Sequence, residues 1–440
     1  MKPSVITGIT SIFRSLRYRN YRLFFCGQGL SLIGTWMQRI ALPWLVYSMT
    51  GSAFMLGLVG FAGQIPTFLF APFAGVLIDR WSRYTILLVT QILAMVQAFI
   101  LTFLFFNHSI QVWQIILLSI FLGCINGFDM PARQSFVIDL IEKREDLGNA
   151  IALNSSMFNV ARLLGPSIAG VLIAITGEGV CFLLNGVSYL FVILFLLMMK
   201  LNPVKKETEH PDVLKGLKEG FSYTFGFKPI RYIIVLLAVV SLAGMPCMLL
   251  MPVFAKSILH GGPHTFGFLM GATGIGALSG AIYMASRKSV LGLGKIVPLF
   301  AAVFGLGLIM FSLSHNFILS MALIIVTGFG MIMQMTSSNT ILQTIVDDDK
   351  RGRVMSFYTM AFMGTAPFGS LLVGVLASSI GAPGTLILGG VACILGAVVF
   401  AGKLKEIRSL IHPVYVRLGI IDELRSGIQT ATELTSLPEE

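Results

Sequence analysis

The chain has 440 residues, of which 55% are hydrophobic and only 12% are charged, and its formal net charge is +11. Soluble globular chains carry roughly a quarter charged residues, so this composition excludes an ordinary soluble protein. The positive residues fall in alternate polar segments and form no basic patch interleaved with aromatics, which argues against a nucleic-acid partner.

Residues 1–22 come before the first apolar run and hold five basic residues. The apolar run that follows is too long for a signal peptide and has no small-residue cleavage site. We therefore interpret residues 1–22 as a cytoplasmic lead-in helix that lies against the anionic leaflet of a membrane.

Apolar runs of about 20 residues make up most of the remaining chain, and each is long enough to cross a bilayer as a helix. They lack the alternation of strands, and only helices and closed barrels satisfy their backbone in lipid. The runs predict an all-α membrane protein with twelve transmembrane helices. The predicted spans are 23–49, 55–78, 84–106, 112–138, 150–175, 179–201, 230–256, 265–286, 296–314, 317–342, 354–379 and 384–402.

The basic residues set the expected topology. Of the 31 Lys and Arg, 27 fall in or at the edge of segments on one side of these spans, and the four exceptions are Lys256 and, inside the spans, Arg39, Arg133 and Arg162. Because cytoplasmic loops carry the excess of Lys and Arg, we expect both termini in the cytoplasm.

The longest polar break, residues 202–229, divides the spans into bundles of six at 23–201 and 230–402. We interpret it as a cytoplasmic linker with a surface helix from about Asp212, and residues 403–440 as a cytoplasmic tail without an assigned function. Shifting the first half by 204 residues brings many glycines into register, including Gly170 with Gly374 and Gly177 with Gly381. This parallel repeat predicts two bundles related by a pseudo-two-fold axis.

The turn after the second span reads GVLIDRWSRY, from Gly75 to Tyr84. It resembles the G-x-L-x-D-R-x-x-R signature of the major facilitator superfamily of secondary transporters, carried here by Gly75, Leu77, Asp79, Arg80 and Arg83, with Ser82 where the family usually has Gly. The resemblance implies a latch in which Asp79 lies near Arg353 to Ser356, at the inner end of the eleventh span. Arg80 and Arg83 would bind acidic partners such as Glu142, Glu145 or Asp146. The alternative is an ordinary positively charged inner loop.

The first span places Gln28, Thr35 and Arg39 on one helix face with Ser31, which predicts a polar stripe along a central cavity. The alternative for Arg39 is a snorkelling or structurally paired side chain. The segment from Gly34 to Ser52 resembles a branch of the superfamily that contains enterobactin-type siderophore exporters and macrolide efflux proteins.

The fourth span places Asn126, Asp129 and Arg133 on one face. Burial raises the pKa of a carboxyl and a nearby Arg lowers it, so Asp129 is a candidate proton-binding group. The alternative is a fixed ion pair with Arg162 or Arg133. Residues Asp129 to Leu140 also resemble the exporter branch.

The fifth span aligns Asn159 and Arg162, and Asp129 and Arg162 have similar predicted depths. We therefore predict that Asp129 and Arg162 pair. The tenth span contributes Gln334 and Ser338 to the predicted cavity. A lining of amides, Met and Phe suits a bulky amphipathic substrate.

Other functional classes lack support in the sequence. The spans contain no HExxH and no Ser-His-Asp arrangement, so we expect no enzyme, and no polar segment is long enough for a sensor domain. The five cysteines have no metal-ligand spacing, so we expect no metal and no cofactor.

The resemblance implies a monomer of a bacterial inner membrane that exports a hydrophobic or amphipathic small molecule, such as a siderophore or a drug, by alternating access. Protons moving down their gradient would drive this export. The alternatives are a lipid or lysophospholipid flippase and a nutrient importer of the same fold.

Overall fold

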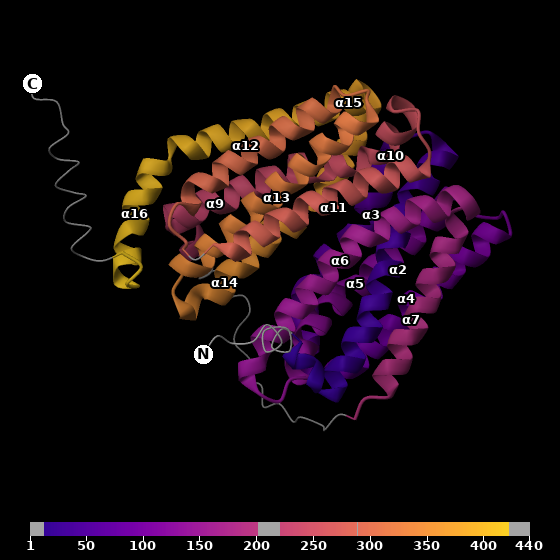
Figure 1. The fold of residues 1–440 in the computed structure, drawn as a ribbon, viewed down its shortest axis with the longest axis horizontal. Coiled ribbons are helices and arrows are strands. Elements are labelled where there is room, and N and C mark those ends of the chain that lie inside the picture. Colours follow the sequence, from indigo (N-terminus) through magenta and orange to yellow (C-terminus); the bar gives the residue numbers. More distant parts are fainter. Residues whose placement is uncertain (1–12, 201–220, 288, 422–440) are drawn as a thin grey trace, which may run out of the picture.

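The computed structural model describes residues 13–200, 221–287 and 289–421, and of residues 71–80, 144, 348 and 349 it describes only the backbone. Every regular element in these residues is a helix (Figure 1). The surface helix expected from Asp212 lies outside the described residues.

Six long helices in chain order build the N-terminal bundle, and they alternate in direction because the connections between them are short. They are α2 (Arg19–Thr50), α3 (Ala53–Arg80), α4 (Arg83–Phe106), α5 (Val112–Asp139), α6 (Arg144–Thr176) and α7 (Glu178–Leu197). We call the end where α2, α4 and α6 begin the near end, and the end where they finish the far end.

The C-terminal bundle begins with an irregular span of five helical pieces. They are α9 (Lys228–Val239), the π-helical η2 (Val240–Gly244), the 3-10 helix η3 (Met245–Leu250), α10 (Met251–Val253) and the π-helical η4 (Phe254–Ile258). Pro246 and Pro252 lie inside this span. Since proline has no N–H to donate, each interrupts the regular hydrogen-bond ladder of the helix.

The remaining spans of this bundle are longer and more regular. They are α11 (Pro263–Ser286), α12 (Leu293–Ser312), α13 (Phe317–Ile345) and the continuous run of α14 (Asp348–Thr359), η5 (Met360–Gly364) and α15 (Ala366–Gly402). The last run holds two spans, because the backbone of α15 breaks at Gly381.

The break at Gly381 has a counterpart in the first half. Gly177, between α6 and α7, has φ 83° and ψ 173°, and Gly381 has φ 78° and ψ 165°. Only glycine adopts this region readily, so the same turn ends the fifth and the eleventh spans. The two residues are 204 positions apart, the shift that aligns the two halves.

Ten stretches of the described chain are long and apolar enough to cross a membrane, and one of them, Lys350–Gly402, contains both spans that meet at Gly381. The more polar α2, with 32 residues, adds another span. The structure thus confirms the predicted all-α membrane fold of twelve helices in two bundles.

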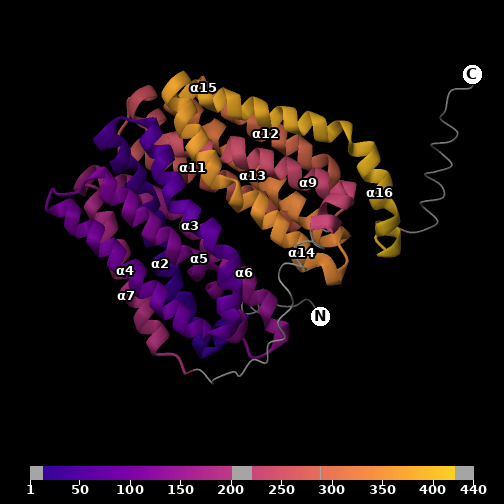
Figure 2. The same ribbon diagram turned by 180° about the vertical axis from the view of Figure 1, so that it is seen from behind.

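The two bundles converge at the far end and diverge toward the near end, in the view of Figure 1 and from behind in Figure 2. The main contacts join α6 to α11 and α3 to α15. At the far end the Tyr47 hydroxyl lies 2.8 Å from the Ser257 hydroxyl, and the rings of Trp44 and Phe266 stack at 6.0 Å.

Two pairs of glycines lie where the bundles touch. A Cβ on Gly170 of α6 would lie 2.8 Å from Gly267 Cα of α11, and a Cβ on Gly374 of α15 would lie 2.8 Å from Gly57 Cα of α3. Gly57 and Gly267 are each the fifth residue of their helix. The contacts are therefore equivalent under the internal repeat, as the pseudo-two-fold relation requires.

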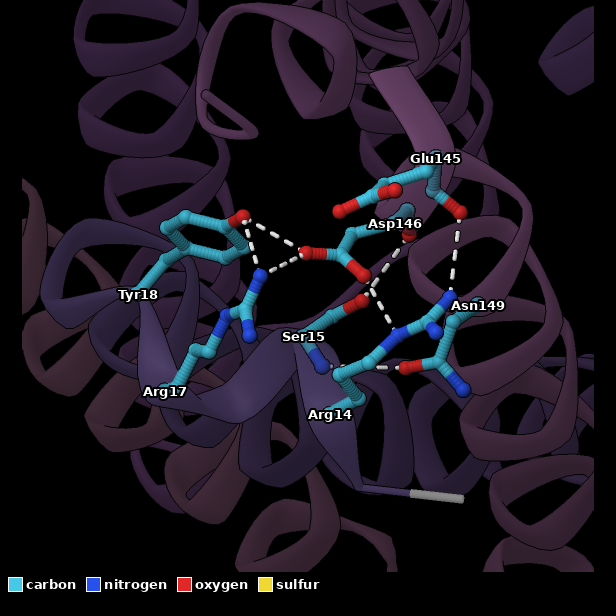
Figure 3. Close-up of polar contacts among 7 residues, drawn as sticks. All are labelled: Arg14, Ser15, Arg17, Tyr18, Glu145, Asp146 and Asn149. Carbon is cyan, nitrogen blue, oxygen red and sulfur yellow. Dashed lines mark hydrogen bonds and ion pairs between the residues drawn. The ribbon is translucent and has the colours of Figure 1, made fainter. Parts of the chain in front are cut away.

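A cluster of ion pairs holds residues 14–18 against α6 at the near end (Figure 3). The carboxylate of Asp146, in the first turn of α6, pairs with Arg14 and Arg17 of η1 (Arg14–Arg17) and accepts a hydrogen bond of 2.6 Å from the Tyr18 hydroxyl. The Asp146 side chain has no exposed surface. An acidic group at this place also complements the positive N-terminus of the helix.

The helix α16 (Leu404–Arg417) follows the last span and lies at the near end of the C-terminal bundle. Its Ile407 and Ile411 are buried. The Lys228 ammonium donates a hydrogen bond of 2.5 Å to the Glu406 carboxylate and joins α16 to the start of α9.

Candidate functional site

The carboxylate of Asp129, near the middle of the fourth span on α5, is almost fully enclosed, at 2% exposed. Thr90 and Gln91 of α4 donate hydrogen bonds of 2.9 and 2.7 Å to Oδ1, and Arg133, one helical turn further along α5, pairs with Oδ2. These three donors suit an ionised carboxylate, which only accepts.

The predicted pair of Asp129 with Arg162 is wrong in this structure, because Arg133 is the partner of the carboxylate. A residue four positions along the same helix faces Asp129 directly, so its guanidinium reaches the carboxylate without crossing to another helix. Sequence reasoning also missed Thr90 and Gln91. The sequence did indicate them, since Thr90 and Gln91 are two adjacent polar residues that interrupt the apolar third span.

Amide side chains connect three helices of the N-terminal bundle next to this site. Gln38 of α2 donates to Gln97 of α4 at 3.0 Å, and Asn185 of α7 donates to Gln38 at 2.8 Å. All three side chains are buried. Buried amides must find partners, so this chain holds α2 against α4 and α7. Thr35, predicted to line the cavity, is half-buried beside the Tyr189 hydroxyl of α7, at 3.4 Å.

Arg39 and Arg162 belong to helices that pack closely. A Cβ on Gly165 of α6 would overlap the Trp36 side chain of α2. The Arg39 side chain is exposed although it lies far from both ends of α2, and its guanidinium lies 5.0 Å from the centre of the Trp36 ring. Arg162 is half-buried and lies three residues before Gly165, the position where α6 packs against Trp36 of α2.

The other predicted cavity residues have differing environments. Asn126 and Asn159 are half-buried, and Asn159 donates to the Ser155 carbonyl of its own helix at 2.9 Å. Gln28 is 2% exposed. Gln334 and Ser338 are buried within the C-terminal bundle, where Gln334 donates to the Ser338 hydroxyl at 3.3 Å. Contact of these residues with a substrate stays a prediction.

The latch predicted after the second span is only partly visible. Gly75, Asp79 and Arg80 lie at the end of α3, where the structure describes the backbone alone. Arg83 is fully described and binds Asp139 at 2.7 Å and the Ser135 carbonyl at 3.0 Å, both on α5.

The acidic partners expected for Arg83 were therefore wrong. Arg83 is the first residue of α4 and lies beside the end of α5, so it reaches Asp139 before the residues of the following turn. Of the three acidic residues expected to bind Arg83, Asp146 instead pairs with Arg14 and Arg17. Arg83 thus joins neighbouring helices of one bundle.

Two similar six-helix bundles that touch at one end, with charges inside the spans, define a multi-pass transporter of small molecules. The family described as Transmembrane secretion effector matches residues 10–412, and the chain belongs to this family of the major facilitator superfamily.

Named relatives cover nearly the whole chain. The staphyloferrin A transporter of Staphylococcus aureus is 26% identical over 380 residues, which are 86% of this chain and 95% of that protein. Macrolide efflux protein A of Streptococcus pyogenes is 21% identical over 405 residues, 90% of this chain and 99% of that protein. These relatives confirm the resemblance to the siderophore and drug efflux branch, and they are transporters, not enzymes.

The fold also matches a solved structure. A bacterial homolog of the human lysosomal transporter Spinster, in an inward-facing and unoccupied conformation, superposes with a TM-score of 0.65 at 14% identity. The match covers 90% of this chain and 98% of that one. At this identity the likeness supports the fold alone.

Proposed function

We propose that this protein is a secondary active transporter of a bacterial inner membrane that exports a hydrophobic or amphipathic small molecule, a siderophore or a drug, driven by the proton gradient. Both termini lie in the cytoplasm, and the monomer is the working unit. The observation that carries the proposal is the pair of six-helix bundles, which touch along the far halves of α3, α6, α11 and α15, together with relatives whose names describe siderophore transport and drug efflux.

The contacts between the bundles support alternating access. With the termini in the cytoplasm, the far end faces outward, and it is closed by the glycine pairs and by Tyr47 with Ser257. The near end faces the cytoplasm, where the bundles diverge. This is the arrangement in which an exporter takes up its substrate. Release requires the bundles to rock, so that the far-end contacts part and the near end closes.

The proton-coupling role of Asp129 and Arg162 stays a prediction. In the proposed cycle, near-end closure moves Arg133 away from Asp129, and the carboxylate then binds a proton. The same predicted site holds Gln28, Thr35, Arg39, Asn126, Arg133 and Asn159 in the first bundle, with Gln334 and Ser338 in the second. The latch of Gly75, Asp79, Arg80 and Arg83 would act where the near end closes.

Reconstitution in liposomes tests the proposal. Protein inserted in liposomes with an imposed pH gradient is given a panel of siderophores and fluorescent dyes, and movement across the bilayer is recorded. We expect uphill movement of at least one compound while the gradient lasts, and no uphill movement after a protonophore collapses it. Uphill movement that survives the protonophore contradicts proton coupling. Absence of movement for every compound contradicts the export function.

Asp129→Asn separates the coupling role from a structural one. If Asp129 carries the proton, the variant loses uphill transport but keeps exchange of substrate across the bilayer, since exchange needs no net proton movement. Unchanged uphill transport removes Asp129 from the coupling mechanism. Ser119→Ala is the matched control, because Ser119 is a buried polar residue of the same helix and its hydroxyl has no hydrogen-bond partner.

A further inference from the structure

Inside the spans of the N-terminal bundle, the arginines outnumber the carboxylates that pair with them among the described side chains. Arg133 is paired with Asp129. Arg39 and Arg162 have no such partner: among the side chains that the structure describes, no carboxylate lies within salt-bridge distance of either guanidinium. Of these three guanidinium groups, only that of Arg133 has a carboxylate within salt-bridge distance among the side chains that the structure describes.

Unbalanced charge within membrane spans needs an explanation. A charged side chain at the centre of a bilayer costs about 3 kcal/mol or more, and such residues usually face a wet path or a partner. Two neighbouring cations also repel each other, which adds to that cost. Arg39 is exposed in this conformation, so water can solvate its charge as long as the near end is open.

Aromatic surface lies directly beside these charges. Trp36 is under the guanidinium of Arg39 and meets the Phe158 ring of α6 edge to face, at 5.8 Å between ring centres. Phe158 is 41% exposed. An exposed aromatic ring next to an exposed cation offers contact to a molecule with one apolar part and one acidic part.

We propose that the transported molecule is an amphipathic anion, whose acidic group binds Arg39 and Arg162 while its apolar part lies on Trp36 and Phe158. This inference rests on the proposed function, because it names the substrate class of the same site. Guanidinium groups bind carboxylates through two parallel hydrogen bonds, which favours an acidic group over a neutral one. Arginines on two helices that pack against each other suit a ligand with more than one carboxylate, or with a single carboxylate between them.

Xanthene dyes test the substrate class directly, since fluorescein is an anion and rhodamine 6G is a cation on a similar ring system. Binding of each dye to the purified protein is measured by fluorescence anisotropy at low and high salt. We expect fluorescein to bind at least tenfold more tightly than rhodamine 6G, and its affinity to fall as salt rises. Equal affinities, tighter binding of the cation, or no binding of fluorescein would overturn the inference.

Variants assign the binding to the two arginines. Arg39→Gln and Arg162→Gln should each weaken fluorescein binding about tenfold or more and leave rhodamine binding unchanged. Arg39→Lys, which keeps the charge, should recover part of the affinity. Arg22→Gln is the control, because Arg22 is exposed near the start of the same helix. A melting temperature for each variant identifies any that fail to fold, and Arg39→Lys then carries the test.

The binding assay also separates this inference from the proposed function. Fluorescein binding that depends on both arginines, without any gradient-driven movement in liposomes, supports the anion site and contradicts proton-driven export. Gradient-driven movement of rhodamine but not of fluorescein supports export and contradicts the anion site. Unchanged fluorescein binding in both Gln variants means that the arginines serve the fold, and the inference fails.

Discussion

The glycine contact between α6 and α11 allows a sharp test of how the far end closes. In Gly170→Ala the new Cβ would lie 2.8 Å from Gly267 Cα and 2.9 Å from the Pro263 carbonyl oxygen. Both are backbone atoms of the opposite bundle, so no side chain can rotate away, and the bundles must separate by several tenths of an ångström. Overpacking of this kind costs about 1–3 kcal/mol.

That cost applies only while the far end is closed. When the bundles part, the methyl group has space, so the variant shifts the equilibrium toward the open far end by a factor of roughly 5–150. Gly374→Ala should give a shift of similar size, because its Cβ would lie 2.8 Å from Gly57 Cα in the equivalent contact.

Spin labels on cysteines at Asn107 and Leu313 report this change, since both residues are exposed at the far end and lie in different bundles. The native Cys26 and Cys124, which are not fully buried, are first replaced by Ser. Electron–electron double resonance should show a longer distance population in Gly170→Ala and Gly374→Ala than in the parent protein.

The chain supplies matched controls for these variants. Gly148 and Gly352 are helical and are related by the same repeat, and apart from their chain neighbours and their own helix backbone no heavy atom lies within 4 Å of the place that a Cβ would take. Their Ala variants should leave the distances unchanged. An unchanged distribution in Gly170→Ala, or an equal change in Gly148→Ala, would refute the role of the glycine pairs in closing the far end.

Three further changes test the packing of the near end and the Asp129 site. Asp146→Asn should release η1 from α6 and speed amide exchange around Tyr18 roughly tenfold, because Arg14 and Arg17 lose their counter-ion; an unchanged exchange rate contradicts this role of Asp146. The hydrogen bond from Lys228 lowers the pKa of the Glu406 carboxyl, so the contact stabilises the fold above the unfolded pKa and is lost as pH falls through the lowered value. The melting temperature should therefore drop more steeply below the ordinary glutamate pKa of 4.5 in the parent than in Lys228→Met, and parallel pH profiles contradict this contribution. Asp129→Asn should lower the melting temperature and the free energy of unfolding, the latter by about 2 kcal/mol, because a partly buried Arg133 is left unpaired. An unchanged melting temperature means that water solvates the Arg133 guanidinium in the variant.

The fold was predictable because its determinants are local. A run of about 20 apolar residues can do little in a membrane except cross it, so the number of helices follows from the lengths of the runs. The repeat was readable because glycine has a backbone role that no other residue replaces at Gly177 and Gly381. Gly170 and Gly374 also align under the repeat, because each lies against the backbone of a helix in the opposite bundle and has no space for a side chain.

The site was less predictable because its contacts join separate helices. Equal depth in the bilayer suggested that Asp129 and Arg162 pair, but depth does not say which helix faces are turned toward each other. The amide chain of Gln38, Gln97 and Asn185 depends on the order of the helices around the bundle, which no single stretch of sequence encodes. The seventh span was predicted at 230–256, but its irregular backbone was not, although Pro246 and Pro252 lie inside it.

The far-end glycines and the unpaired arginines are linked if the bundles move as rigid bodies. Parting of Gly170 from Gly267 rocks the near halves of the helices together, and the exposed Arg39 then loses contact with water. Burying an unpaired charge costs several kcal/mol even after the protein relaxes. A bound anion replaces the lost water as a partner, so the loaded protein can close its near end at a lower cost than the empty one. In this way the charge of the cargo would itself bias the conformational change that exports it.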